Sequence, residues 1–374
     1  MKSPFLFGRT VSAEGFTNRV KEIKRLKANF IHQVNTILIS PRRWGKSSLV
    51  KKVSDEVKSR AIRIVQIDLL GIRSEEEFYK VLATETIKAT GNRLEEWLHA
   101  CKTFFKHITP KISVGSNPVE DFEISFEWHE IEKNYKEILQ LPEMIAAAKK
   151  IRIIICIDEF QNLAVFREPL LFQKRLRSEW QHQQRVNYCL YGSQHHMMME
   201  LFERQSMPFY KFGDVMYLSR IDRAEWISFI VDKFRETGKK IDAAHAESIA
   251  QTVQDHSYYV QQLSHIVWLN TEKVATTEIL ENSVNDLLEQ NAILYTRDTE
   301  ELSTNQLLFL KAIAEGVHKG LSSIKTIEKY RFGTSANVLK IKHALMKKEL
   351  IEERGGNVYF IDPVYELWFR KFVI

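Results

Sequence analysis

This chain has few glycines, prolines and cysteines, and it has no long apolar runs. Its longest unbroken apolar stretches, such as Ile153 to Ile157, are far too short to cross a membrane. The N-terminal residues lack the apolar segment that a secretory signal needs. The 14 Gly and 8 Pro argue against long disordered tracts. Cys101, Cys156 and Cys189 cannot all pair, and they show no CxxC spacing. We therefore expect a cytoplasmic protein with no membrane partner.

The composition is that of a soluble globular protein, with 44% hydrophobic and 27% charged residues. A chain of 374 residues exceeds one ordinary core, so we expect two or three domains. The formal net charge of +6 is compatible with nucleic-acid binding but does not by itself indicate it. No repeat with a period of about 20–50 residues is visible, which argues against a solenoid or a propeller.

Short apolar runs and helical patterns alternate from residue 18 to about residue 220. The predicted strands are Thr36–Ile39, Ile62–Asp68, Ile153–Ile157 and Tyr188–Tyr191. Short strands separated by helices predict a parallel sheet covered on both faces, and therefore the α/β class. Residues 108–128 interrupt this alternation. There Ile124, Phe126 and Trp128 alternate with polar neighbours, which predicts a half-exposed strand or hairpin inserted in the core.

The sequence changes character after the predicted sheet. The pattern is helical from Asp222 to about residue 292. The last stretch shows helical patterns over Thr304–Glu315, Ser323–Tyr330 and Ala336–Lys348, then a hairpin with Gly355-Gly356 at its tip. Three helices and a hairpin predict a winged helix-turn-helix. We therefore divide the chain into an α/β core at 1–220, a helical domain at 221–298 and a winged-helix domain at 299–374.

The segment Ser40-Pro-Arg-Arg-Trp-Gly-Lys-Ser47 has the features of a phosphate-binding loop. It lies between a predicted strand and a predicted helix, so its N–H groups and the helix N-terminus can point at phosphate oxygens. Gly45 allows close backbone approach, Lys46 can neutralise the terminal phosphates, and the Ser47 hydroxyl can ligate Mg²⁺. The loop departs from GxxxxGK[ST] because Ser40 stands where the first glycine is expected. Since Gly-Lys-Ser also occurs by chance at helix starts, the interpretation depends on a partner motif.

Asp158 and Glu159 supply that partner motif, directly after the predicted strand Ile153–Ile157. At the carboxyl edge of an open parallel sheet, where ligands bind, Asp158 can hold Mg²⁺ through water. Glu159 can orient and deprotonate an attacking water. The alternative is a solvated acidic turn at a strand end. The phosphate loop upstream favours the catalytic interpretation.

A third candidate follows the strand Tyr188–Tyr191, where the chain runs Gly192-Ser193-Gln194. A polar residue at this end of the sheet can sense the γ-phosphate, and Ser193 is our candidate. A glycine turn with a local serine cap remains the alternative.

Together these strings resemble the archaeal-type ATPases, a branch of the STAND class of AAA-related NTPases that is also widespread in bacteria. The matching strings are Phe16-Thr-Asn-Arg19 with Glu22, Ser40 to Ser47, Ile157-Asp-Glu-Phe-Gln161, Gly192-Ser193, Pro208-Phe-Tyr210, Tyr258-Tyr-Val-Gln-Gln-Leu263, and Asp362-Pro363 with Trp368-Phe369. The resemblance covers nearly the whole chain. It implies a P-loop ATPase core, a helical lid and a winged-helix domain.

The resemblance also implies ATP and Mg²⁺ as ligands and assigns roles to single residues. Lys46 and Ser47 become the phosphate and Mg²⁺ ligands, Asp158 the second metal ligand and Glu159 the catalytic base. The box from Phe16 to Arg19 is expected near the adenine. The expected nucleotide contacts are Ser40, Pro41, Arg42, Arg43, Trp44, Gly45, Lys46, Ser47, Ser48 and Arg19, and the expected catalytic group is Glu159, Lys46 and Ser193.

Three features depart from the family pattern. One is Ser40 in the loop. Another is Asp255-His-Ser257, which stands where relatives carry Gly-x-Pro before two tyrosines, so a sensor role for His256 stays open. Many relatives also carry a nuclease-like domain after the winged helix, whereas this chain stops soon after Trp368. The candidates for an arginine finger or an equivalent cation are Arg204, Lys211 and Arg220.

The last predicted helix of the winged helix would be its recognition helix. We expect Val338, Leu339, Ile341, Leu345 and Met346 to face the core, and Asn337, Lys340, Lys347 and Lys348 to be exposed. Exposed lysines favour contacts with DNA phosphates, whereas base reading would need Asn337 or an arginine. A winged helix used for protein contacts is the alternative, so duplex DNA and a partner protein both remain open.

The leading hypothesis is a Mg²⁺-dependent ATPase in which nucleotide state is coupled to movement of the lid and the winged helix. One alternative is a nucleotide-loaded switch without turnover. The other is a DNA-binding regulator whose output is assembly with DNA, with a partner protein or with further copies of itself. The presence of Glu159 favours the ATPase, because an inactive relative would often have lost it.

Overall fold

The computed structural model describes residues 2–8, 19–117, 121–193 and 195–374. These residues form two compact units. The first runs from residue 10 to Ser219. The second runs from Arg220 to Ile374 and also includes the N-terminal residues. Among the described residues, no helix is long and apolar enough to cross a membrane.

A sheet of five parallel strands forms the centre of the first unit, in the order β2-β5-β6-β1-β7. The strands are β1 (Thr36–Ile39), β2 (Ile62–Asp68), β5 (Arg152–Asp158), β6 (Val186–Gly192) and β7 (Asp214–Tyr217). The four predicted strands are confirmed, and the α/β class with them. The sequence did not reveal β7, a short edge strand that is only partly buried.

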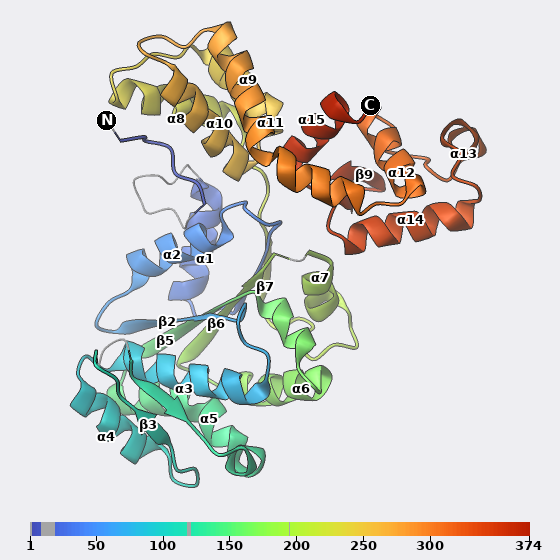
Figure 1. Cartoon of the computed structure of the whole chain (residues 1–374). Helices are drawn as coiled ribbons and strands as arrows, with labels where there is room; N and C mark the ends of the chain where they lie inside the picture. Colours follow the sequence, from blue (N-terminus) through green and yellow to red (C-terminus); the bar gives the residue numbers. More distant parts are fainter. Residues whose placement is uncertain (1, 9–18, 118–120, 194) are drawn as a thin grey trace. The chain divides into compact units, whose positions relative to one another are not determined.

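Helices cover both faces of this sheet (Figure 1). Two of them, α1 (Val20–Ile31) and α2 (Lys46–Val57), pack against one face, while α3 (Glu75–Thr90), α5 (Trp128–Lys149) and α6 (Pro169–Trp180) pack against the other. The shorter elements α4 (Leu94–Phe104), η2 (Phe160–Val165) and α7 (His195–Glu203) complete the unit. Because side chains alternate along a strand, Leu38 faces α1 and α2 whereas Ile37 and Ile39 face the opposite core.

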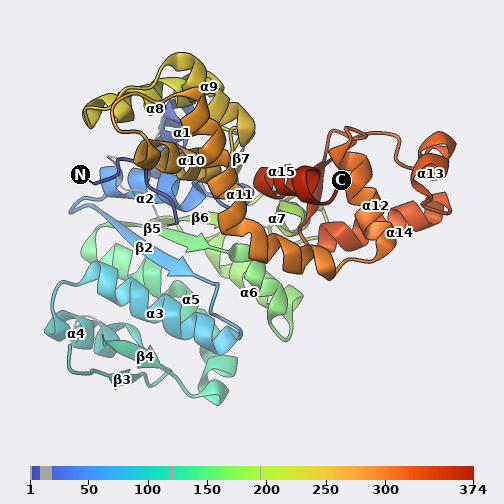
Figure 2. The same cartoon turned by 45° about the horizontal axis from the view of Figure 1, so that its top comes forward.

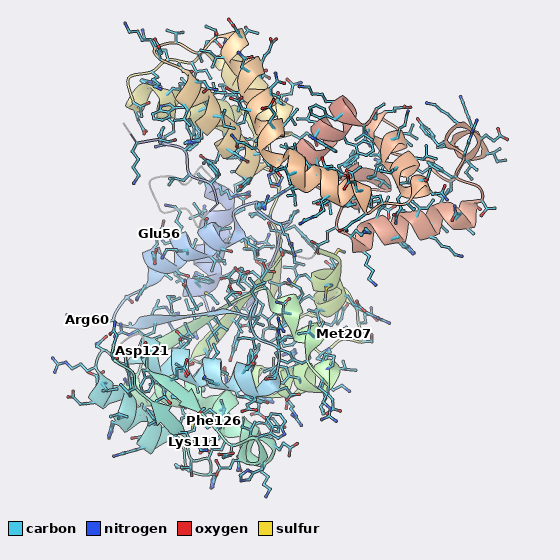
Figure 3. All side chains as sticks on the ribbon, viewed as in Figure 1. Glu56, Arg60, Lys111, Asp121, Phe126 and Met207 are labelled. Carbon is cyan, nitrogen blue, oxygen red and sulfur yellow. The ribbon has the colours of Figure 1, made fainter. Side chains whose placement is uncertain are left out.

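The predicted hairpin within residues 108–128 is present as β3 (Lys111–Ser113) and β4 (Glu123–Ser125), which pair antiparallel. Ile124 and Phe126 are buried, and the N–H of Ile124 donates to the Thr84 hydroxyl of α3 at 3.0 Å. Figure 3 labels Lys111 and Phe126 in this region. Trp128 breaks the predicted alternation, because it is 40% exposed and begins α5.

The second unit is helical except for one hairpin. Its elements are α8 (Arg223–Glu236), α9 (Ala243–Thr252), α10 (Ser257–Asn270), α11 (Thr277–Glu300), α12 (Thr304–Ala314), α13 (Ile324–Tyr330), α14 (Ser335–Lys347), β8 (Ile351–Arg354), β9 (Asn357–Phe360) and α15 (Pro363–Phe372). Figure 2 shows α11 running from the helices α8 to α10 toward the winged helix. Phe5, from the N-terminal residues, packs against the rings of Phe229 and Phe234.

The winged helix-turn-helix predicted for the end of the chain is confirmed, with two differences. Leu339 is 51% exposed, so its predicted place in the core is wrong. Buried Val338, Ile341 and Leu345 share one face of α14, and the helical period turns Leu339 away from it. The other difference is α15, which the sequence analysis did not identify as a helix. Its start carries the expected signal, an N-cap Asp362 before a proline.

Asp362 holds three helices of the second unit together. One carboxylate oxygen accepts the N–H groups of Val364 and Tyr365 at 2.9 and 3.1 Å and so caps α15. The other oxygen accepts the hydroxyls of Tyr259 in α10 and Tyr295 in α11. Both tyrosines are buried, at 2% and 3% exposure. This single carboxylate therefore joins α10, α11 and α15.

We expect Asp362→Ala to lower the free energy of unfolding by about 2–4 kcal/mol, because it removes a cap and the shared acceptor of two buried hydroxyls. Urea unfolding measures the change. Asp242→Ala is the matched control, since Asp242 caps α9 at the N–H of His245 (2.7 Å) but its side chain is 62% exposed. It should cost only about 1 kcal/mol. Equal losses for the two variants would contradict the joining role of Asp362.

Candidate active site

The phosphate-loop segment connects β1 to α2 through a tight turn. Gly45 lies immediately before α2 with φ 88° and ψ 20°, a region that glycine adopts without strain. Arg43 also has a positive φ, of 63°. Ser40 lies outside the left-handed region and is fully buried, with its N–H donating to the Gly192 carbonyl at 3.4 Å. Ser40 can therefore replace the expected glycine without backbone strain.

The other loop residues divide by exposure. Pro41 is half-buried, Arg42 and Arg43 are exposed, and Trp44 is 7% exposed. The Trp44 carbonyl accepts the Arg19 guanidinium at 2.9 Å, and a second Arg19 nitrogen donates to the Ser219 carbonyl at 2.9 Å. Arg19 is thus a buried support for the loop backbone. The rest of its predicted box, residues 16–18, lies outside the described residues.

Lys46 and Ser47 reach the acidic pair across the end of the sheet. The Ser47 hydroxyl donates to Asp158 Oδ2 at 2.7 Å. Lys46 Nζ lies 3.0 Å from Glu159 Oε1 and 3.5 Å from Asp158 Oδ1. The two motifs are 111 to 113 residues apart in sequence, and the parallel sheet brings their side chains into direct contact.

Ser193 lies beside the same carboxylates because β6 runs between β1 and β5. Its hydroxyl donates to Glu159 Oε2 at 2.9 Å. Gln161 Nε2 donates to the same oxygen at 2.5 Å, a contact that the sequence motifs did not predict. Gln161 belongs to the Asp-Glu-Phe-Gln string that carried the family resemblance. That string was the available signal, but it gave the glutamine no role.

Burial and local charges shift the two carboxyls in opposite directions. Burial raises the pKa of Asp158 above its usual range, against the opposing effects of the Lys46 charge and the Ser47 hydrogen bond. Burial also acts to raise the pKa of Glu159. The hydrogen bond from Gln161 and the charge of Lys46 outweigh it, so the pKa of Glu159 is lowered. Lys46 thus acts on both carboxyls, and the additional hydrogen bonds from Gln161 and Ser193 distinguish Glu159 from Asp158.

The oxygens of Ser47 and Asp158 fit Mg²⁺, which prefers hydroxyl, carboxylate and phosphate oxygens and usually keeps several waters. Among the described residues, no group of three or more His, Cys, Asp or Glu is arranged to hold a metal ion. A magnesium site here would therefore be shared between these two protein ligands, water and the phosphates of a nucleotide.

The candidates for an arginine finger have local partners. Arg204 pairs with Glu200 at 3.0 Å, and Lys211 lies over the ring of Tyr210. Arg220 donates to the Gln254 carbonyl at 2.5 Å. His256 is buried directly before α10 and packs against Tyr259. The role of each in catalysis stays a prediction.

Comparison with known proteins bears on the fold that holds these residues. A family model described as a probable winged helix domain matches residues 283–371. No curated protein matches the chain. The Walker-type ATPase of Pyrococcus abyssi is similar in structure, with a TM-score of 0.67, 17% identity and coverage of 96% of this chain and 97% of that chain. The ORC2 protein of Aeropyrum pernix, in ADPNP–ADP complexes, has a TM-score of 0.59 at 12% identity and covers 99% and 100% of the two chains.

The parallel sheet with β6 between β1 and β5, and with a glycine turn leading into α2, defines the fold of a P-loop ATPase. In particular, the chain has the fold of the Walker-type ATPases of archaea and ends in a winged-helix domain. This confirms the fold and the archaeal-type resemblance that the sequence motifs indicated.

Proposed function

We propose that this protein binds ATP with Mg²⁺ and hydrolyses it, as an ATPase of the STAND-like archaeal type. The observation that carries the proposal is the contact of Lys46 and Ser47 with Glu159 and Asp158. Lysine and a hydroxyl at the start of a helix suit phosphates and Mg²⁺, and an acid pair at a strand end suits Mg²⁺ and water activation. Neither the phosphate loop nor the acid pair would by itself indicate hydrolysis.

Each residue of the site then has one task. The backbone from Gly45 to Ser48 and the Lys46 ammonium bind the phosphates, while Ser47 and Asp158 hold Mg²⁺. When bound, Mg²⁺ neutralises charge on the phosphate oxygens. Glu159 orients the attacking water and accepts its proton, and Ser193 contacts the γ-phosphate. The remaining predicted nucleotide contacts are Ser40, Pro41, Arg42, Arg43, Trp44 and Arg19.

Nucleotide binding requires an exchange of partners at Lys46. Its ammonium now pairs with Glu159 and Asp158, and it must turn toward the phosphates when ATP enters. The exchange frees Glu159 Oε1, the oxygen that then faces water. We propose a core within residues 1–220, a lid at 221–298 and a winged helix at 299–374, although residues 1–9 and Arg220 group with the second compact unit. We also propose that the lid and winged helix respond to the bound nucleotide.

Phosphate release from ATP tests the proposal. We expect release in Mg²⁺ and none in excess EDTA, because Ser47 and Asp158 cannot place the phosphates without the ion. If the protein binds ATP but releases no phosphate in Mg²⁺, hydrolysis is refuted and the nucleotide-loaded switch replaces it. If it does not bind ATP at all, the nucleotide site itself is wrong.

The winged helix is the candidate contact for duplex DNA. Lys340, Lys347 and Lys348 are exposed on or beside α14. Asn337, one of the residue types that base reading would need, donates its amide to the Phe332 carbonyl at 2.7 Å. With this amide engaged inside the domain, we propose phosphate contacts without strong base reading.

We expect duplex binding to weaken with salt, with a log–log slope that falls by about 2 in Lys340→Ala/Lys347→Ala, since each phosphate contact contributes about 0.9. Lys51→Ala/Lys52→Ala in α2 is the control, and its slope should match that of the unmodified protein. Filter binding at several salt concentrations measures both slopes. A slope near zero for the unmodified protein would exclude phosphate contact.

One observation favours a protein contact for the same domain. Leu339 in α14 and Ile324 in α13 are 51% and 76% exposed, and apolar side chains contribute little to phosphate binding. If DNA binding fails the salt test, a partner protein becomes the favoured ligand of the winged helix. Leu339→Glu would then be the variant that disrupts it.

A further inference from the structure

Gln161 occupies an unusual place for a polar side chain. It lies in η2, two residues after Glu159, and is only 2% exposed. Its amide nitrogen donates to Glu159 Oε2 at 2.5 Å. Its amide oxygen, by contrast, is buried and makes no hydrogen bond with any described residue. A buried acceptor without a hydrogen bond is unfavourable, so the amide oxygen does not account for a glutamine at this position. Among the described residues, the hydrogen bond to Glu159 is the polar interaction that does.

The glycine at position 192 leaves the space that the Gln161 amide occupies. A Cβ on Gly192 would lie 2.0 Å from Gln161 Oε1, far inside contact distance. Gly192 ends β6, and Ser193, which follows it, donates to the same Glu159 oxygen at 2.9 Å. The end of β6 therefore shapes the position of Gln161 and supplies a second donor beside it.

The backbone and the carboxylate of Glu159 are both unusual in this site. Its φ is 49°, in the left-handed region that is uncommon for residues other than glycine. Its two carboxylate oxygens also have different partners. Oε2 accepts Gln161 and Ser193, whereas Oε1 accepts Lys46 alone among the contacts described. When Lys46 and Ser193 turn to the phosphates, Oε1 is released and Gln161 still holds Oε2.

We propose that Gln161 is a positioning residue that fixes Glu159 through Oε2 and so aims Oε1 at the attacking water. The inference rests on the proposed ATPase function. An amide is suited to this task, because its N–H donates to the carboxylate but cannot take the proton that Glu159 must accept. A glutamate at position 161 would instead set two carboxyls side by side.

The first test removes the donor while keeping the side-chain volume. Gln161→Met is expected to lower kcat by about 10- to 100-fold, as for loss of a hydrogen bond to a charged group. KM for ATP should stay within about twofold, because Lys46 and Ser47 are untouched. The matched control is Gln173→Met, since Gln173 in α6 is equally buried at 2% exposure and its amide oxygen is also unpaired among the described residues. The control should keep the kcat of the unmodified protein.

The second test approaches the same contact from β6. Gly192→Ala should displace Gln161 and lower kcat as Gln161→Met does. In a Gln161→Ala background the added methyl meets no amide, and its other close neighbour is Met198 Sδ at 2.8 Å, the end of a flexible side chain. Gln161→Ala/Gly192→Ala should therefore turn over no more slowly than Gln161→Ala. Thermal unfolding of each variant shows whether it is folded.

The outcomes separate this inference from the proposed function. Absence of turnover in the unmodified protein would refute the ATPase and the inference with it. Turnover in the unmodified protein, with Gln161→Met within twofold of its kcat, would refute the positioning role alone. If Gln161→Met raised KM by the same factor by which it lowered kcat, the positioning role would also be overturned. The same holds if the effects of Gln161→Ala and Gly192→Ala on kcat were fully additive in the double variant. A folded Gln161→Met protein with low kcat and unchanged KM supports it.

Discussion

Glu159→Gln is expected to lower ATP turnover by about 10²- to 10⁴-fold, the range typical of losing a general base. Glutamine has nearly the same shape and keeps a carbonyl oxygen for the donors of Gln161 and Ser193. It cannot accept the proton of the attacking water. It also no longer competes as an anion for Lys46, so ATP affinity should be unchanged or higher. Phosphate release and calorimetric titration with ATP measure the two effects.

Glu203→Gln is the control for this change, because Glu203 is exposed at the end of α7. Its turnover and affinity should match those of the unmodified protein. A Glu159→Gln protein that hydrolyses ATP at the normal rate would show that the proton leaves by another route. A protein that loses ATP affinity instead would assign Glu159 to binding.

Lys46→Ala is expected to weaken ATP binding by about 10- to 150-fold. This is the loss of affinity that corresponds to removing one hydrogen bond between charged groups. The Lys46 ammonium is also the cation that stands against two carboxylates, whose side chains are 16% and 19% exposed. Without it, Asp158 and Glu159 repel each other and the incoming phosphates, which pushes the loss toward the upper end of this range.

Titration with ATP in Mg²⁺ measures the affinity of Lys46→Ala. Lys51→Ala is the control, since Lys51 lies further along α2, is 48% exposed and pairs with Asp55. The control should bind ATP normally. Equal affinities for the unmodified and Lys46→Ala proteins would place the nucleotide elsewhere.

The strands, the phosphate loop and the Asp158-Glu159 pair could be predicted because each is encoded by a short run of neighbouring residues. Strands of a parallel sheet are rich in apolar residues, so β1, β5 and β6 stand out in the sequence as buried runs, and β2 stands out by its repeated Ile and Val. The edge strand β7 does not, because it is short and only partly buried. The motif residues meet because strand ends share one edge of the sheet, which is a consequence of topology.

The features that could not be predicted depend on individual side-chain contacts, which leave no periodic pattern in the sequence. The contact of Gln161 with Glu159 follows from the left-handed turn at Glu159 and from the space beside Gly192. Neither has a sequence pattern of its own. Asn337 looked available for bases, but its amide is used by the Phe332 carbonyl five residues before it. Leu339 was predicted to face the core, but it lies on the exposed side of α14, away from the buried face of Val338, Ile341 and Leu345.

The most direct test of the account is steady-state phosphate release from ATP in Mg²⁺, measured for the unmodified protein beside Glu159→Gln, with and without duplex DNA. The contact of the phosphate loop with the acid pair predicts that the unmodified protein exceeds Glu159→Gln by at least about a hundredfold in one of these conditions. Equal release by the two proteins, with and without DNA, would contradict the assignment of this site as the centre of an ATPase.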